Sequence, residues 1–234
     1  MKKKIFIVAL VVCIMAISIA SASMAYFTDT EKATNTFTSG DVAIKLTEQN
    51  ANGLVFDSSN AALDDPVAFG NLYPGIDVVK KPVITNTGSE DAYIGAIITI
   101  DNVAEADGEI GDITKLLALP SATIDANDKM TVKLDQFIMG LSTDATIVYE
   151  AVKTNGDVTS YKIYMIFGEK TSTNGAYQLF TGVYLDPDWN NAQMKECKGL
   201  NIDVEAYAVQ TAGFATADAA FQAAFGTEFA PYFA

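Results

Sequence analysis

The chain has 234 residues with 15 lysines, no arginine, no histidine and 29 acidic residues, which gives a formal net charge of −14 at pH 7. This charge repels nucleic acid and anionic membrane surfaces, and without arginine the chain lacks the bidentate group that best binds phosphate. A chain without histidine cannot form Ser-His-Asp or Cys-His catalytic sites, or any histidine-ligated zinc site. We therefore expect no nucleic-acid partner and no histidine-dependent enzyme.

Residues 1–25 have the organisation of a secretory signal peptide. Three lysines at positions 2–4 precede an apolar run over residues 5–17, and small residues then continue to Ala25. A permanent membrane anchor is the alternative, because residues 5–25 are just long enough to cross the roughly 30 Å hydrocarbon core as a helix. The order of charged, apolar and small segments favours export, so we expect a secreted protein.

Two small-x-small sites fit a signal peptidase, Ala20-Ser21-Ala22 and Ser23-Met24-Ala25, and their spacing leaves both open. Cleavage after Ala25 makes Tyr26 the first residue. Removal of the leader takes the net charge from −14 to −17, because the leader holds three lysines and no acidic residue. It also leaves Cys197 as the only cysteine, so we expect no intrachain disulfide and interpret Cys197 as an ordinary thiol that lacks a histidine base.

Strand-like periodicity dominates the rest of the chain. The expected strands share short runs of β-branched and aromatic residues bounded by Gly, Asn and Asp, and they cover residues 42–46, 78–85, 93–100, 130–139, 146–153, 159–167, 177–185 and 200–210. Asn155-Gly156 predicts a tight hairpin. Phe221 and Phe225 lie four residues apart and predict a short amphipathic helix over 217–225. Many strands and little helix predict an all-β sandwich over residues 41–234.

An acidic stretch interrupts the strand pattern between Asp101 and Asp128, where we expect a loop insertion with a short helix at 113–119. Calcium is the cofactor that this stretch could bind, because oxygen ligands suffice for it. The candidate ligands are five carboxylates, at Asp101, Glu105, Asp107, Glu109 and Asp112. Their spacing does not match the twelve-residue calcium loop, and a solvated acidic loop is the alternative.

A second acidic loop holds Asp186, Asp188 and Trp189, a combination that could form a sugar site with an aromatic platform. Glycoside hydrolysis needs two carboxylates at a defined separation across the substrate. Neighbouring residues in a loop do not establish that separation. We therefore expect no glycosidase.

Three blocks of residues resemble the TasA/camelysin family. The most specific begins with Ala25-Tyr26-Phe27-Thr28-Asp29-Thr30. The blocks are residues 25–30 with Asn35, Phe37 and Gly40; residues 73–75, 86–88 and 91–94; and residues 204–210 with Gly213 and Phe214. Gly95 departs from the family's pattern, since we expect a basic residue there. Residues 101–191 carry no signature of the family.

The resemblance implies a jelly-roll β-sandwich that polymerises into fibres of the extracellular biofilm matrix. It implies that a dedicated SipW-type signal peptidase cuts before Tyr26, and that the freed segment 26–40 of one subunit adds as a strand to its neighbour. The donor residues carried over are Tyr26, Phe27, Thr28, Asp29 and Phe37. Such head-to-tail strand addition does not close on itself and gives filaments. The implied partners are copies of the same chain and, beyond them, other matrix proteins.

Two alternatives of a different class remain open. Residues 26–38 could form the first strand of their own sheet, which would give a monomeric surface adhesin or accessory matrix protein. Camelysin-like relatives are described as cell-surface metalloendopeptidases, but this chain offers no histidine ligand and a carboxylate-only zinc site would be chemically unusual. We therefore expect that the chain is not an enzyme.

Overall fold

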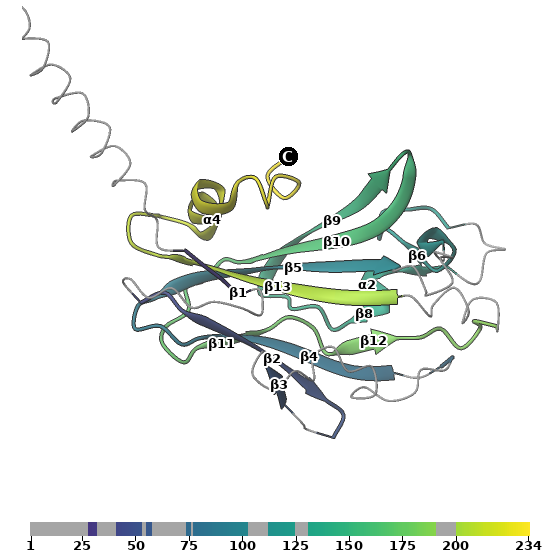
Figure 1. The fold of residues 1–234 in the computed structure, drawn as a ribbon, viewed down its shortest axis with the longest axis horizontal. Coiled ribbons are helices and arrows are strands. Elements are labelled where there is room, and N and C mark those ends of the chain that lie inside the picture. The colour runs from purple at the N-terminus through teal and green to yellow at the C-terminus, as the bar shows by residue number, and fades with distance from the viewer. Residues whose placement is uncertain are drawn as a thin grey trace, which may run out of the picture.

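The computed structural model describes residues 28–31, 41–52, 55–57, 74–75, 77–102, 112–124, 131–190 and 200–234. These residues form two antiparallel sheets packed face to face, with a helix lying over the outer side of one sheet (Figure 1). The predicted all-β sandwich with a short C-terminal helix is confirmed.

The strands of the sandwich are short at three edges and long in the middle. The five-stranded sheet has the order β1 (Thr28–Glu31), β13 (Leu200–Gln210), β5 (Ala92–Asn102), β10 (Asp157–Phe167) and β9 (Ala145–Thr154). The six-stranded sheet has the order β3 (Val55–Asp57), β2 (Ile44–Asn50), β4 (Asp77–Asn86), β12 (Gly182–Tyr184) and β8 (Ile138–Met139), with β11 (Ala176–Gln178) paired to β4. A two-stranded parallel pair joins β6 (Leu117–Ala118) to β7 (Val132–Lys133).

The connectivity of the sheets is that of a jelly roll. The first and last described strands, β1 and β13, are neighbours, and the chain passes between the two sheets from β4 to β5, from β10 to β11 and from β12 to β13. Strands β9 and β10 form the predicted hairpin, in which Asn155 and Gly156 have φ of 55° and 100°. These left-handed values are those that a two-residue hairpin turn requires.

Two of the expected strands are interrupted. Residues 130–139 contain β7, the short helix α2 (Leu134–Phe137) and β8, because Leu134, Phe137 and Ile138 are all buried at a spacing that a strand cannot bury on one face. Residues 177–185 contain β11 and β12, separated where Leu179 and Phe180 are both fully buried.

The helix expected at 113–119 is much shorter than predicted. It is a single 3-10 turn, η3 (Ile113–Lys115), and residues 117–118 form β6 instead. The side chain of Asp112 accepts a hydrogen bond from the backbone N–H of Thr114, with an N to O distance of 3.0 Å, and so caps the turn. The C-terminal helix α4 covers the predicted residues, Ala217–Phe225.

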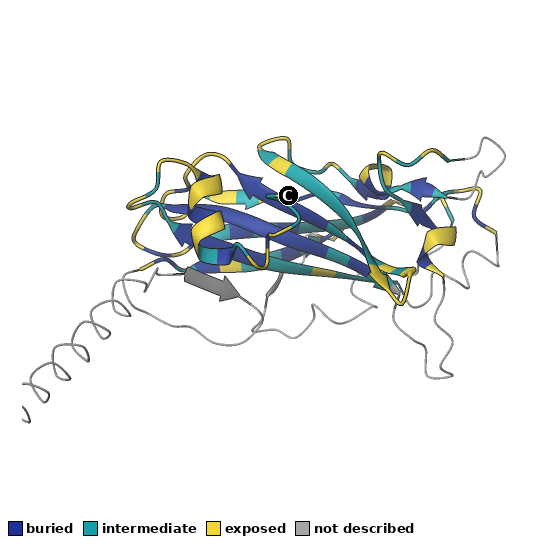
Figure 2. Ribbon diagram, turned by 90° about the horizontal axis from the view of Figure 1, so that it is seen from above, coloured by how far each residue is buried: buried dark blue, intermediate teal, exposed yellow. Residues whose placement is uncertain are grey.

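Alternation along the five-stranded sheet separates two hydrophobic clusters. On β5, Ile94 and Ile98 face the six-stranded sheet and contribute to the main core. Tyr93 and Ile97 face the other way and pack under α4 and the residues that follow it. Figure 2 shows buried residues along the middle of these strands and exposed residues at the turns. The C-terminal part of the chain therefore forms a cap over one sheet.

The cap explains Gly95, where the family pattern leads us to expect a basic residue. A Cβ at this position would lie 2.6 Å from a ring carbon of Phe221 and 2.9 Å from the carbonyl oxygen of Met165. Distances below 3.0 Å are not tolerated without movement of the neighbouring groups. Phe221 therefore takes the space that a side chain at position 95 would need.

Candidate functional site

Strand β1 lies at the edge of the five-stranded sheet and pairs with β13. The pairing is antiparallel, with Thr28 opposite Val209 and Glu31 opposite Ala206. Of the predicted donor residues, Thr28 and Asp29 belong to this strand. The others, Tyr26, Phe27 and Phe37, lie outside the described residues. In the structure of one chain, β1 therefore borders its own sheet, and its donation to a neighbour stays a prediction.

The partner strand β13 has two unlike halves. Its last part, Ala206–Val209, is fully buried or nearly so and carries the ladder with β1. Within the described residues, the ladder with β1 covers Ala206–Val209 and none of the first part, Leu200–Val204. There the inward-facing side chains of Leu200, Ile202 and Val204 pack against the core but are only partly buried. An edge strand that adds here can cover apolar side chains and supply backbone hydrogen bonds.

The fold is fixed immediately after the expected donor segment. The backbone N–H groups of Thr87 and Gly88 both donate to the carbonyl oxygen of Ala43, at 2.8 and 3.0 Å, and the N–H of Glu90 donates to the carbonyl of Asp41. Gly88 is required at this crossing, since a Cβ would lie 2.0 Å from the carbonyl oxygen of Asp41. Residue 41 is therefore held by the turn between β4 and β5.

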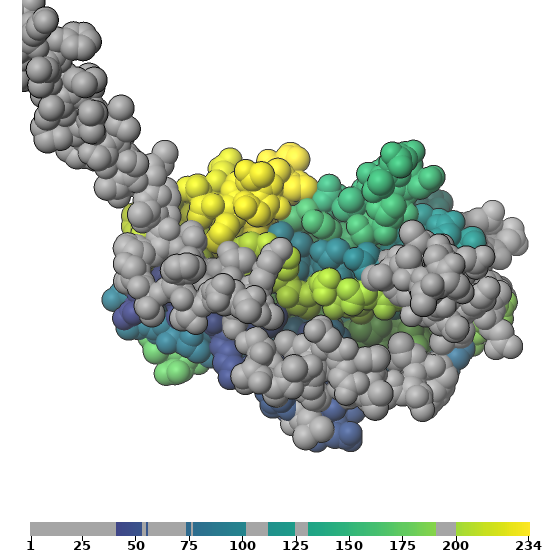
Figure 3. All heavy atoms as spheres, viewed as in Figure 1, coloured from purple at the N-terminus to yellow at the C-terminus, as the bar shows by residue number. Residues whose placement is uncertain are grey.

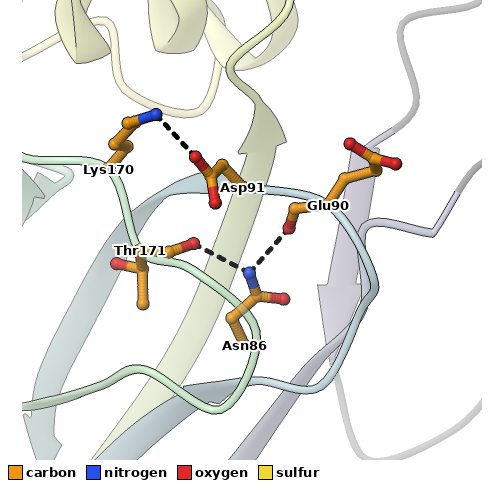
Figure 4. Close-up of polar contacts among 5 residues, drawn as sticks. All are labelled: Asn86, Glu90, Asp91, Lys170 and Thr171. Atoms are coloured by element: carbon orange, nitrogen blue, oxygen red, sulfur yellow. Dashed lines mark hydrogen bonds and ion pairs between the residues drawn. The ribbon is translucent and has the colours of Figure 1, made fainter.

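The side chain of Asn86 ties this turn to the loop after β10 (Figure 4). Asn86 is fully buried, and its Nδ2 donates to the carbonyl oxygens of Glu90 and Thr171, each at 2.8 Å. Its Oδ1 accepts from the N–H of Gly88 at 3.0 Å. Every polar atom of the amide therefore has a partner, which is the requirement for burying it.

Tyrosine hydroxyls at the margin of the cap are paired with carboxylates. The hydroxyl of Tyr164 donates to Oε2 of Glu150 at 2.7 Å, and that of Tyr207 donates to Oε2 of Glu205 at 2.5 Å. Burial, reinforced by these acceptors, raises the pKa of both tyrosines far above their usual range. Figure 3 shows the C-terminal residues gathered beside the β9–β10 hairpin. Their hydroxyls are therefore neutral donors to carboxylates of β9 and β13, while their rings contact Phe225 and Phe229 of the cap.

The structure describes two of the five candidate calcium ligands. Asp101 and Asp112 are described, whereas Glu105, Asp107 and Glu109 are not. Within the described ranges, no group of three or more His, Cys, Asp or Glu side chains is placed to hold a metal ion. Calcium binding by the loop therefore stays a prediction.

Asp101 has an unusual environment of its own. It lies opposite Asn201 on β13 and Ser160 on β10, on the outer face of the sheet. Its Oδ1 atom is buried and makes no hydrogen bond. Burial, together with the nearby charge of Asp203, raises the pKa of the Asp101 carboxyl, while a hydrogen bond from Asn201 lowers it. Ionisation of Asp101 is therefore less favourable in the folded protein than in water.

The acidic loop at Asp186 does not form a sugar platform. Trp189 is buried in the main core, so its ring cannot stack on a sugar. The backbone N–H of Asp188 donates to the side chain of Asp186 at 2.7 Å, which is a local turn. These residues are therefore structural.

The expected cleavage residues Ser23, Ala25 and Tyr26 lie outside the described residues, as does Cys197. Among the helices that are described, none has the length and apolar character needed to cross a bilayer.

Sequence reasoning identified a strand at 200–210 but not its role as the partner of the N-terminal strand. The jelly-roll connectivity that the resemblance implies could have predicted this pairing, because that arrangement places the first and last strands side by side. Asn86 enters the sequence analysis only within the block 86–88, although an amide between two apolar strands is a candidate for burial. Searches against protein-family models, curated proteins and solved structures give no match to this chain.

Proposed function

We propose that this protein is a secreted structural subunit that polymerises into extracellular matrix fibres by exchange of its N-terminal strand. The observation that carries the proposal is the pairing of β1 with β13. In the part of the chain that the structure describes, β1 pairs with four of the eleven residues of β13. The same segment from a neighbouring copy can form the same ladder.

The turn between β4 and β5 holds the chain at Asp41. Among the residues whose burial the structure describes, the members of both hydrophobic clusters lie after this point. The turn therefore gives a fixed point from which a donated segment can extend. The resemblance of residues 25–30 to the TasA/camelysin family supports the same function, and the family's export route accounts for the leader.

Electron microscopy of two chains tests this function. One chain begins at Tyr26 and the other at Gly40, so that only the first contains β1. We expect fibres from the first chain and no fibres from the second. The absence of fibres from both would overturn polymerisation, and fibres from both would show that β1 is not the donor.

Disulfide trapping separates donation from pairing within one chain. Asp29 lies opposite Ala208 in the β1–β13 ladder, so the variant D29C/A208C with Cys197→Ser brings two thiols within bonding range. Donation gives a ladder of linked chains on a non-reducing gel. K45C/T85C, with the same Cys197→Ser change, is the control, because these residues are opposite within one sheet and link inside one chain.

A monomeric adhesin or accessory matrix protein is the second candidate, because β1 does border its own sheet. In that case D29C/A208C closes within one chain and the protein stays monomeric. The same gel therefore decides between the two functions.

A further inference from the structure

The two main sheets have four edges, and three of them are formed by short strands. Strands β1, β3 and β8 contain four, three and two residues. The fourth edge is β9, which contains ten residues. Its described ladder runs to β10 along its whole length, so its other side carries no strand in the described part of the chain. The β9–β10 hairpin curls away from the body of the sandwich (Figure 1).

Strand β9 has little of the usual protection of an exposed edge. Natural edges are blunted by proline, by charged side chains or by short length. Ala145–Thr154 contains no proline and only two charged residues, Glu150 and Lys153. Glu150 accepts the hydrogen bond of Tyr164 within its own sheet, and Lys153 is exposed. The strand carries no net charge in a chain of −14, so it is a place where two copies meet without local repulsion.

We propose that β9 pairs with β9 of a second copy, antiparallel and about a two-fold axis, so that one sheet runs through both molecules. The two edges are then identical, and each outward N–H meets an outward C=O of the partner strand. A second copy fits this edge because its β9 has the same ten residues, and because Glu150 and Lys153 leave each strand without net charge.

The side chains select the register. Residues that lie opposite each other must point to the same face, so the axis passes through a residue and not between two residues. An axis at Glu150 would set two carboxylates against each other. An axis at Tyr149 pairs the two tyrosines, sets Glu150 against Val148 of the second copy, and sets Lys153 against Ala145. No like charges are opposed in that register, and an aromatic pair lies at its centre.

This contact lies at the opposite edge of the sheet from β1, so it does not depend on strand donation. In fibres it would join neighbouring fibres side by side, and in a monomeric protein it would give dimers. The two contacts can therefore be tested separately.

Cysteine trapping tests the register. Thr146 lies opposite Val152 of the second copy when the axis passes through Tyr149. We expect T146C/V152C with Cys197→Ser, made in the chain beginning at Tyr26, to give a covalent dimer. Linkage within one chain is not feasible, because the two positions lie about 20 Å apart along an extended strand. T146C/T154C is the matched control, since those positions meet only with the axis at Glu150. Equal dimer from both variants, or none from either, overturns the proposal.

A charge change tests the surface without cysteines. Lys153→Glu gives the strand a net negative charge, and we expect loss of the dimer in sedimentation velocity. Lys45→Glu makes the same change in net charge on the exposed side of β2 and leaves the dimer intact. A dimer unaffected by Lys153→Glu, or one lost equally in both variants, shows that β9 is not the contact.

Discussion

The two ends of the five-stranded sheet differ in how completely they are covered. At one end, the row of Tyr207, Gly95 and Ile166 lies beneath the cap, and the opposite face of the sheet packs into the main core. At the other end, the outer face carries Asp203, Thr99 and Lys162, which are exposed or half-buried (Figure 2). We therefore expect the covered end to contribute more to stability than the open end. The comparison predicts that equivalent changes matter most at the covered end.

Phe221→Ala should give the largest loss of stability. The ring is fully buried between Gly95 and the aromatic side chains of Phe225 and Phe229, so its removal leaves a cavity and should lower the free energy of unfolding by about 3–5 kcal/mol. Urea unfolding measures the loss as a lower midpoint at unchanged slope. Phe214→Ala is the control, because Phe214 is only half-buried in the same cluster and should cost less. Equal losses would mean that the cap is not a packed unit.

Asn86→Ala should have the next largest effect. It removes three hydrogen bonds from a buried turn, those to the carbonyls of Glu90 and Thr171 and the one from the N–H of Gly88, and we expect a loss of roughly 2–3 kcal/mol. Thermal and urea unfolding both measure it. The control is Lys170→Ala in the same close-up, which breaks the exposed pair with Asp91 and should leave the midpoint nearly unchanged (Figure 4). An unchanged free energy of unfolding in Asn86→Ala would show that this side chain does not stabilise the turn.

Asp101→Asn, at the open end, should slightly increase the free energy of unfolding. The folded-state pKa of Asp101 is raised above its ordinary value of 3.8, so ionisation destabilises the fold once the pH exceeds the unfolded-state pKa. The variant should therefore be slightly more stable than the parent at pH 7, and the gain should vanish at about pH 3, where both forms are neutral. Unfolding curves across this range measure it. Asp144→Asn, a change on the exposed turn before β9, controls for the net charge.

The sequence predicted the strands where the alternation is clear. Residues 200–210 and 217–225 match β13 and α4, because each shows one regular period. It failed where consecutive residues are all apolar, as at Leu179 and Phe180, since such a run shows no period and fits a strand as well as a buried turn.

The candidate site was predictable only in part. The N-terminal segment could be named from the resemblance, and β1 includes Thr28 and Asp29. Its position beside β13 depends on contacts between the two ends of the chain, and local periodicity carries no information about them. The sequence likewise does not predict that β9 lies at an edge, because a strand at an edge and a strand in the middle of a sheet can have the same sequence.

The adjacency of β1 and β13 also has a consequence for the order of events during synthesis. The ribosome makes β1 first and its partner last, so β1 has no place in its own sheet until nearly the whole chain exists. At 5–20 residues per second, a chain of 234 residues takes about 10–50 s to make. A chain that stops before β13 therefore leaves β1 without its partner strand, however completely the strands between them have folded.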